Sequence, residues 1–418
     1  MKSLDNIEYE LELSDKQIGK PGPLWRNRDY MLLWSGRLVS SFGSRISMFA
    51  VPLIVLALTH SPAQAALLEI LETLPLLALS LPAGALVDRW NRKWIMIVCD
   101  FGRAVALGSV ALAFGLGHLS LWWLGAVALL DGTFSIFFTL AQSSCLPHVV
   151  REDQLSDAIA RNQSISASSQ LFGSVLAGLC YQVGRAFPFL MDAISYVISM
   201  CSLCFVKTPL QGESPKQQQK VDMKGEILEG IRWLWQQPLL RYITFLTWGL
   251  LIPCVGYTLI ILVLAQQQHA SAFAIGLIMA SGGLGNIAGT LIAGPLLKRF
   301  RLGQIFVVTM WIWVLTWLPL AFAPNLVWLG IANVAGFIVV PVYFVAQMSS
   351  FMKYVPDHLR GRVNSVFSLI IDGSVPLGVG ATGVLLQFLG PVSTILIMFV
   401  PQFLLVIGSM FYRPLRAA

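Results

Sequence analysis

The stretch Gly84-Ala-Leu-Val-Asp-Arg-Trp-Asn-Arg-Lys93 places one acid and three cations between two runs of apolar residues. Arginine and lysine in such a position lie in the headgroup region of a membrane. A glycine near the end of an apolar helix lets another backbone approach closely, and Asp88 can accept hydrogen bonds from the N-terminus of a neighbouring helix. The stretch therefore predicts a short cytoplasmic turn between two transmembrane helices, with a generic positive loop as the alternative.

The composition of the whole chain indicates a membrane protein. Of its 418 residues, 56% are hydrophobic and 12% are charged, whereas soluble proteins carry roughly 25% charged residues. The net charge of +7 comes from cations that recur in short groups between apolar segments. They act as topology signals, so nucleic acid is not an expected partner. All six cysteines lie in apolar segments without metal-ligand spacing, so neither a disulfide framework nor a metal site is predicted.

Apolar segments long enough to cross ~30 Å of hydrocarbon recur about twelve times along the chain. Lysine and arginine concentrate in every second connection, which places both termini in the cytoplasm by the positive-inside rule. The sequence therefore predicts an all-α, multi-pass membrane protein. The segments are residues 30–58, 63–87, 94–117, 119–145, 158–183, 187–206, 239–265, 272–297, 303–323, 325–352, 363–389 and 391–412.

Two halves and two further regions divide the chain. Residues 1–24 form an acidic cytosolic tail, residues 25–206 a first six-helix half, and residues 239–418 a second six-helix half. The linker between them, residues 207–238, begins with a polar run. It ends with a helix over residues 221–237 whose apolar positions recur at helical spacing, as in a helix that lies in the membrane interface. We interpret this helix as a tether of the two halves, with a regulatory role as the alternative.

The opening stretch resembles the signature of the major facilitator superfamily, Gly-x-x-x-Asp-Arg-x-Gly-Arg-Arg, which lies between the second and third helices. Asn91 stands where that pattern usually has glycine. The matching residues are Gly84, Asp88, Arg89, Arg92 and Lys93. Four further stretches are similar to the macrolide-efflux and enterobactin-exporter branch of the superfamily. They are Arg37-Leu-Val-Ser-Ser-Phe-Gly43, Asp100-Phe-Gly-Arg103, residues 155–162 and Met191-Asp192-Ala-Ile-Ser-Tyr196.

This resemblance implies the major facilitator fold, with twelve transmembrane helices in two pseudo-symmetric six-helix halves around a central cavity. Small residues crowd the second, fifth, eighth and eleventh segments, and helices lined in this way approach closely. In the fold resembled, these helices form the interface between the halves. Among the small residues are Gly173, Gly178, Gly283, Gly378 and Gly380.

From the branch resembled we expect a secondary transporter in the inner membrane of a bacterium that exports hydrophobic or amphipathic compounds in exchange for protons. We expect a monomer whose partners are a small lipophilic substrate, protons and membrane lipids, with no cofactor beyond the proton gradient. The chain has no Gly-x-x-x-x-Gly-Lys-Ser/Thr loop, so ATP-driven transport is not expected. A lipid or lysophospholipid flippase on the same fold stays an alternative. A membrane-embedded enzyme or receptor is a more distant one, because no catalytic constellation is visible.

Charges at membrane depth cost at least ~2.5 kcal/mol each on insertion scales, so they are candidates for proton coupling. Counted along their helices, Arg45 and Asp131 both reach the middle of the bilayer, which predicts an ion pair whose acid exchanges protons. Glu69 and Glu72 would pass protons from the outer side. Two alternatives stay open: Glu72 is itself the coupling acid, or Arg45 and Asp131 form a pair with a structural role only.

A cytoplasmic gate is predicted where Asp88 meets the positive N-terminus of the eleventh helix together with Arg360 and Arg362. That contact would close the cytoplasmic side in the outward-facing state. Asp100 and Arg103, three residues apart, are interpreted as an intrahelical pair that builds the inner surface. The remaining gate residues are Gly84, Arg89, Arg92 and Lys93.

The middle of the protein is predicted to hold an aromatic cavity with few hydrogen-bonding side chains. Such a cavity suits a bulky lipophilic or amphipathic solute better than a sugar or an anion. Alternatively, the rings face lipid or form belts at the membrane surfaces. The residues predicted to line the substrate cavity are Arg37, Trp248, Tyr257, Phe337, Tyr343 and Asp372.

Overall fold

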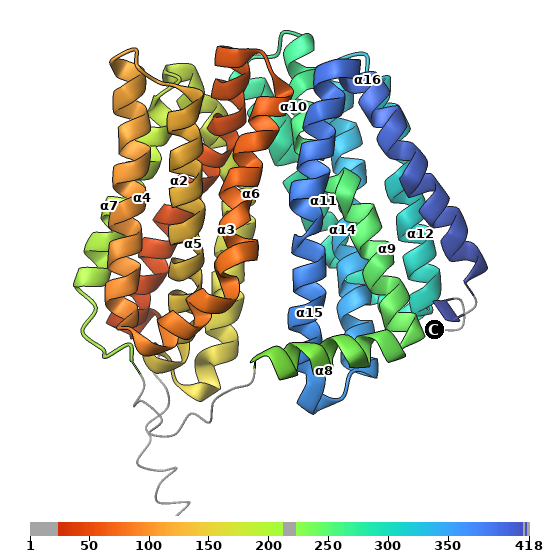
Figure 1. The fold of residues 1–418 in the computed structure, drawn as a ribbon, viewed down its shortest axis with the longest axis horizontal. Coiled ribbons are helices and arrows are strands. Elements are labelled where there is room, and N and C mark those ends of the chain that lie inside the picture. Colours follow the sequence, from red (N-terminus) through yellow and green to blue (C-terminus); the bar gives the residue numbers. More distant parts are fainter. Residues whose placement is uncertain (1–23, 212–222, 413, 416–418) are drawn as a thin grey trace, which may run out of the picture.

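The computed structural model describes residues 24–211, 223–412 and 414–415 (Figure 1). Within these ranges all regular secondary structure is helical, which confirms the all-α prediction. The predicted cytosolic tail, except for its last residue, and the polar run of the predicted linker lie outside the described residues.

Six long helices build the first half of the described chain. Side-chain caps set where several of them begin: Asn27, Ser61, Asn91 and Ser120 each accept a hydrogen bond from the backbone N–H three residues further on. Asn91, which replaces the glycine of the signature, therefore caps the helix that follows the turn. The helices are α2 (Arg28–Thr59), α3 (Pro62–Arg89), α4 (Arg92–Gly115), α5 (Leu121–Val149), α6 (Leu155–Val183) and α7 (Phe187–Cys204), with short 3-10 turns η1 (Leu24–Arg26) and η2 (Glu152–Gln154).

The second half uses shorter pieces because several of its helices are interrupted. Breaks fall at Gly256, Thr316 and Gly373, and α16 turns sharply at Gly390, where φ is 73° and proline follows. The helices are α9 (Pro238–Val255), α10 (Tyr257–Gln267), α11 (Ala272–Arg299), α12 (Leu302–Leu315), α13 (Trp317–Ala321), α14 (Leu326–Tyr354), α15 (Arg360–Asp372) and α16 (Ser374–Phe411), with the 3-10 turn η3 (Asp357–Leu359).

Ten helical stretches in the described ranges are long and apolar enough to cross a membrane. The last of them, Arg360–Phe411, contains the turn at Gly390 and so has two arms. Helix α6 is not among the ten, although it has 29 residues and packs between α2 and α11. Helix α6 and the two arms of the last stretch correspond to ranges that the sequence predicted as separate segments.

Among the described residues, the contacts between the two halves gather toward one end of the bundle. We call this the outer end and the end where α2 begins the inner end, after the predicted orientation. Helix α6 packs on α11 and α3 packs on α16. A Cβ at Gly178 would lie 2.5 Å from the backbone oxygen of Ala272, and one at Gly276 would lie 2.5 Å from that of Ser174. These glycines lie near the outer end of their helices, and the halves diverge toward the inner end (Figure 1). The predicted interface of small residues is confirmed.

A separate helix, α8 (Met223–Gln236), crosses the inner end of the second half (Figure 1). Its Leu234 is 2% exposed and belongs to a cluster with Val363 of α15, whereas Trp235 is exposed. Glu229 pairs with Arg362 of α15 at 2.6 Å. Helix α8 is therefore bound to the second half by one buried face. Its bounds are close to the predicted range, residues 221–237.

Candidate transport site

A cavity of about 210 Å³ lies between the two halves. Helices α2, α3 and α6 form one wall, and α10, α11 and α14 form the other. Five residues predicted to act in proton coupling or substrate binding therefore meet at one site. The residues that matter for the argument are Arg45, Glu69 and Glu72 on the first wall and Tyr257, Asn333 and Phe337 on the second.

The first wall carries three ionisable side chains. Arg45, Glu69 and Glu72 form no ion pair with any described residue, and the Arg45 guanidinium lies 3.6 Å from the Met48 sulfur. Arg45 reaches the cavity because α2 packs against α6 at Gly173, where a Cβ would lie 2.8 Å from that of Arg45. Charges left free in a membrane protein are expensive and therefore functional candidates.

The second wall is aromatic. The Tyr257 ring centroid lies 5.9 Å from that of Phe337 and 5.6 Å from that of Trp317, with the rings edge to face, an arrangement that aromatic pairs prefer. Helix α11 permits this packing through Gly285, where a Cβ would lie 3.0 Å from Phe337 Cβ. This wall offers apolar surface in a fixed shape.

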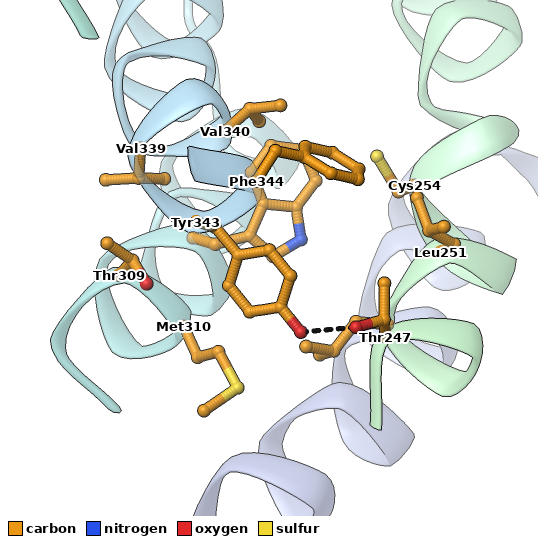
Figure 2. A pocket seen from close by; sticks show the side chains of 11 residues that line it. Thr247, Leu251, Cys254, Thr309, Met310, Val339, Val340, Tyr343 and Phe344 are labelled. Atoms are coloured by element: carbon orange, nitrogen blue, oxygen red, sulfur yellow. Dashed lines mark hydrogen bonds between the residues drawn. The ribbon is translucent and has the colours of Figure 1, made fainter. Parts of the chain in front are cut away.

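Tyr343, predicted in the substrate cavity, lies instead in a pocket of about 60 Å³ inside the second half (Figure 2). Its hydroxyl is 2.6 Å from Thr247 Oγ1, and that hydrogen bond turns the ring away from the central cavity. Arg37, Trp248 and Asp372 line neither the central cavity nor this pocket. Trp248 and Tyr343 were predicted at the site as aromatic residues, and Arg37 and Asp372 as charges at membrane depth, but the sequence does not reveal which face of a helix a side chain occupies.

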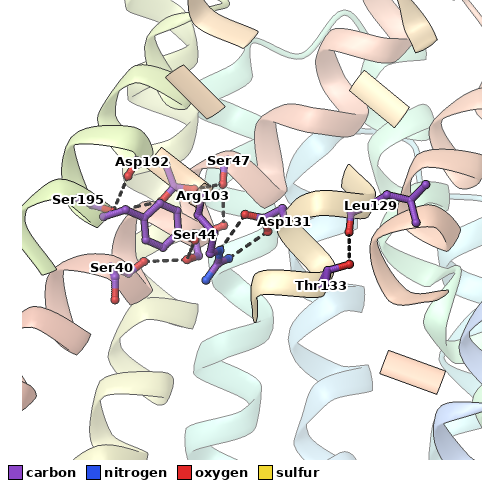
Figure 3. Close-up of polar contacts among 10 residues, drawn as sticks. Ser40, Ser44, Ser47, Arg103, Leu129, Asp131, Thr133, Asp192 and Ser195 are labelled. Carbon is purple, nitrogen blue, oxygen red and sulfur yellow. Dashed lines mark hydrogen bonds and ion pairs between the residues drawn. The ribbon is translucent and has the colours of Figure 1, made fainter. Parts of the chain in front are cut away.

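A polar network inside the first half corrects the predicted pairing of Asp131. Its carboxylate accepts two hydrogen bonds from Arg103 of α4, from Nε at 2.8 Å and from Nη2 at 3.0 Å (Figure 3). Arg45 is therefore not its partner, because Arg45 turns to the cavity between the halves. The predicted Asp100–Arg103 pair is also wrong: Asp100 is 0% exposed and forms no ion pair with the described residues.

The network continues through α7 and back to α2. The Arg103 guanidinium lies 4.2 Å from the centre of the Tyr196 ring, and the Tyr196 hydroxyl is 2.7 Å from Ser44 Oγ. Asp192, which is 0% exposed, accepts hydrogen bonds from Ser47 and from Ser195 (Figure 3). Sequence reasoning missed the role of Arg103 and Tyr196, although both lie in stretches that resemble the efflux branch.

A second cavity, of about 220 Å³, lies beside this network within the first half. A space of this size with polar groups in its wall can hold water. Glu72 lines both this cavity and the central one. It is therefore the carboxylate in the wall between the polar network and the substrate-sized space. The polar lining consists of Ser44, Ser47, Glu72, Arg103, Asp131 and Ser135.

The predicted gate contact is not formed in this structure. Asp88 lies 3.7 Å from Arg92 of its own turn, Arg360 pairs with Asp357 at 2.8 Å, and Arg362 pairs with Glu229. The reason is that the halves are apart at the inner end. The contact was predicted for the outward-facing state, and for that state it stays a prediction.

The other residues of the signature hold the turn to the first half. Lys93 Nζ donates to the backbone oxygens of Cys204 at 3.2 Å and Val206 at 2.8 Å. Arg92 Nη1 donates to the Ser144 oxygen at 3.0 Å. Gly84 has open space where a Cβ would be, so it leaves room for a helix to approach. Among the described residues, no group of three or more His, Cys, Asp or Glu side chains could hold a metal ion.

Two helical halves around a central cavity define a membrane transporter of the major facilitator fold. The structure superposes on the nucleoside transporter NupG with a TM-score of 0.77, at 12% identity over 92% of this chain and 100% of that one. The family profile described as transmembrane secretion effector matches residues 21–416. The chain therefore belongs to this family of the major facilitator superfamily.

Two relatives are named for the compounds they export. The multidrug efflux pump Tap of Mycolicibacterium fortuitum is 24% identical over 411 residues, which are 95% of this chain and 97% of that one. Macrolide efflux protein A of Streptococcus pyogenes is 27% identical over 190 residues, 45% of this chain and 47% of that one. The resemblance to macrolide-efflux proteins is confirmed, and the chain is a multi-pass transporter.

Proposed function

We propose that this transporter exports hydrophobic or amphipathic compounds in exchange for protons, by alternating access, from the cytoplasm of a bacterium. It acts as a monomer in the inner membrane with both termini in the cytoplasm. The observation that carries the proposal is the central cavity, which has free carboxylates on one wall and packed aromatic rings on the other. Tap and macrolide efflux protein A support it as relatives whose names describe efflux.

The aromatic wall supports a lipophilic substrate. Tyr257 and Phe337 both line the cavity, and burial of apolar area against such a wall is favourable at roughly 25 cal/mol per Å². Glu69 and Glu72 on the opposite wall attract a cationic group. A compound with an apolar body and a positive or polar end meets both walls.

Glu72 is our candidate for the coupling acid. Asp131 is held by Arg103 through two hydrogen bonds, whereas Glu72 has no ion pair with the described residues and lines both cavities. An acid in that wall can bind a proton from the polar side or a cationic substrate from the central side. The charged groups around it are Glu69 of its own helix, Arg103 of α4, Asp131 of α5 and, on the same wall of the central cavity, Arg45 of α2.

The arrangement of the halves supports export from the cytoplasmic side. Contacts between them lie at the outer end, and the gate contact at the inner end is unformed. In the predicted orientation this is an inward-facing state, which loads substrate from the cytoplasm. Asp88, Arg360 and Arg362 would then meet when the inner end closes.

The test is accumulation of rhodamine 6G in everted membrane vesicles with and without a pH gradient. We expect gradient-dependent accumulation by the wild type and its loss in Glu72→Gln. A matched control is Asp357→Asn, because this carboxylate lies at the surface with an 85% exposed side chain, and it should accumulate dye normally. Accumulation that survives collapse of the gradient would contradict proton coupling. Transport of a fluorescent lysophospholipid without transport of the dye would favour the flippase.

A further inference from the structure

We propose that the side-chain carbonyl of Asn333 accepts a hydrogen bond from the transported compound, so that the site selects amphipathic molecules that carry an N–H or O–H donor on their apolar body. The inference rests on the proposed function and specifies its substrate class. Asn333 lies on α14, lines the central cavity and is 2% exposed.

The orientation of the amide is fixed by α11. Asn333 Nδ2 donates to the backbone oxygen of Ile278 at 2.7 Å and lies 3.2 Å from Ser281 Oγ. A backbone carbonyl can only accept, so the nitrogen must face Ile278 and the oxygen must point the other way. The hydroxyl of Ser281 is itself directed to the Ile278 and Gly330 oxygens, at 2.6 and 3.2 Å.

The Asn333 oxygen is left without a partner. It is buried and accepts no hydrogen bond from the described residues. Buried polar atoms are nearly always paired, and one that is not needs an explanation. Because Asn333 belongs to the cavity wall and its nitrogen is turned to α11, a donor on a bound compound is the partner that this geometry allows.

The surroundings of Asn333 combine the acceptor with an apolar surface. Phe337 follows it by one helical turn, so the ring and the amide share a face of α14. Gly282 makes room for both, since a Cβ there would lie 3.0 Å from Asn333 Nδ2 and 3.0 Å from Phe337 Cδ2. A compound that stacks its apolar body on Phe337 and Tyr257 brings its edge to Asn333. An N–H or O–H group on that edge can donate to Asn333, whereas a nitrogen or oxygen that carries methyl groups in place of the hydrogen cannot.

The test compares rhodamine 6G with tetramethylrhodamine ethyl ester. Both are lipophilic cations of similar size, but rhodamine 6G has two secondary N–H groups and the ester has none. Binding to the purified protein is measured by fluorescence anisotropy in the absence of a proton gradient. We expect the wild type to bind rhodamine 6G roughly tenfold more tightly, which is the effect of one hydrogen bond to a buried acceptor.

Variants assign the preference to Asn333. Asn333→Leu keeps the shape of the side chain, removes the acceptor and should bind the two dyes alike. Ser281→Ala is the matched control, since it removes one neighbour of Nδ2 but leaves the acceptor, and it should keep the preference. If Asn333→Leu does not fold, equal binding of both dyes by the wild type still overturns the proposal.

The outcomes separate this inference from the proposed function. Equal binding together with gradient-driven export of both dyes overturns the role of Asn333 and leaves proton-coupled efflux standing. Absence of both binding and transport overturns the two proposals together. A preference that persists in Asn333→Leu assigns donor recognition to another residue and overturns the inference.

Discussion

The two halves share one helical plan but differ in what they bury. The first half holds Arg103, Asp131 and Asp192 inside its helices. Arg103 donates to Asp131 and lies over the Tyr196 ring, and Asp192 accepts hydrogen bonds from serines. The second half buries rings, and its interior polar contacts are neutral, such as Trp313 Nε1 to Gln402 Oε1 at 2.8 Å. Under the proposed function this difference would divide the work: the first half would handle protons, and the second would hold the apolar body of the substrate.

The physical basis of this division is the free-energy cost of placing an ionised group in an apolar medium. Buried ions must be paired with good geometry, and the pairs need neighbours that complete their hydrogen bonds. Concentrating them in one half leaves the other free to pack aromatic rings tightly. The central cavity touches both kinds of wall, so a compound bound there contacts the rings and the free carboxylates at once.

The largest expected effect comes from breaking the Arg103–Asp131 pair. Asp131→Asn leaves Arg103 buried without its counter-ion, and we expect about 3–5 kcal/mol of destabilisation, the usual result of removing one partner of a buried pair. Arg103→Gln combined with Asp131→Asn should recover much of that loss. Thermal unfolding of the purified protein measures it. If the loss of stability in the double variant equals the sum of the losses in the two single variants, Arg103 and Asp131 do not stabilise the fold as a pair.

The next effect concerns the aromatic wall. Phe337→Ala removes the ring that packs on Tyr257 and lines the cavity. We expect rhodamine 6G to bind about tenfold more weakly, because one aromatic contact is lost. Phe337→Leu keeps apolar volume and should lose less. The pH dependence of binding should not change in either variant. A shifted pH dependence would contradict the separation of the halves.

A smaller effect is expected at the inner gate, where the halves must meet to close. Asp88→Asn should lower transport severalfold and raise labelling of a cysteine introduced at Met348, by favouring the inward-facing state. Met348 is exposed on α14 and lies three turns from Phe337 on the same face. Labelling in everted vesicles with an impermeant maleimide measures this. Unchanged labelling with full transport would rule out a gate at Asp88.

The smallest effect is expected for Glu229→Gln. The Glu229–Arg362 pair links α8 to α15, but its side chains are 51% and 33% exposed, and surface pairs contribute about 0–1 kcal/mol. We expect nearly unchanged thermal stability and an unchanged order of substrates, in contrast with the buried pair of the first half. A changed substrate order would show that α8 regulates the site and is not merely a tether.

Much of the fold could be predicted from the sequence because a membrane imposes length and charge rules on every segment. The face of each helix that carries the polar side chains could not be predicted from the sequence. Arg45 and Asp131 have similar depth, but depth says nothing about rotation about the helix axis, and rotation turns Arg45 to the cavity and Asp131 to Arg103. Asp100 and Arg103 are near in sequence, yet the facing acid of α5 is the partner.

The role of a single polar residue inside an apolar run could not be predicted from the sequence. Asn333 lies in a long apolar segment, and its proposed function as an acceptor depends on where α11 places the backbone oxygen of Ile278. Tyr343 and Phe337 are both aromatic residues of the same apolar segment. Thr247 holds Tyr343 inside the second half, whereas Phe337 lines the cavity. These assignments need the packing of helices that are distant in sequence.

Proton release on substrate binding tests the division of labour most directly. Purified protein in weakly buffered detergent solution is mixed with rhodamine 6G, and the pH change is followed with a soluble indicator. We expect that the wild type releases protons as it binds, that Glu72→Gln binds the dye without release, and that Phe337→Ala releases as many protons per bound dye as the wild type. Release by Glu72→Gln equal to that of the wild type would contradict proton exchange at Glu72.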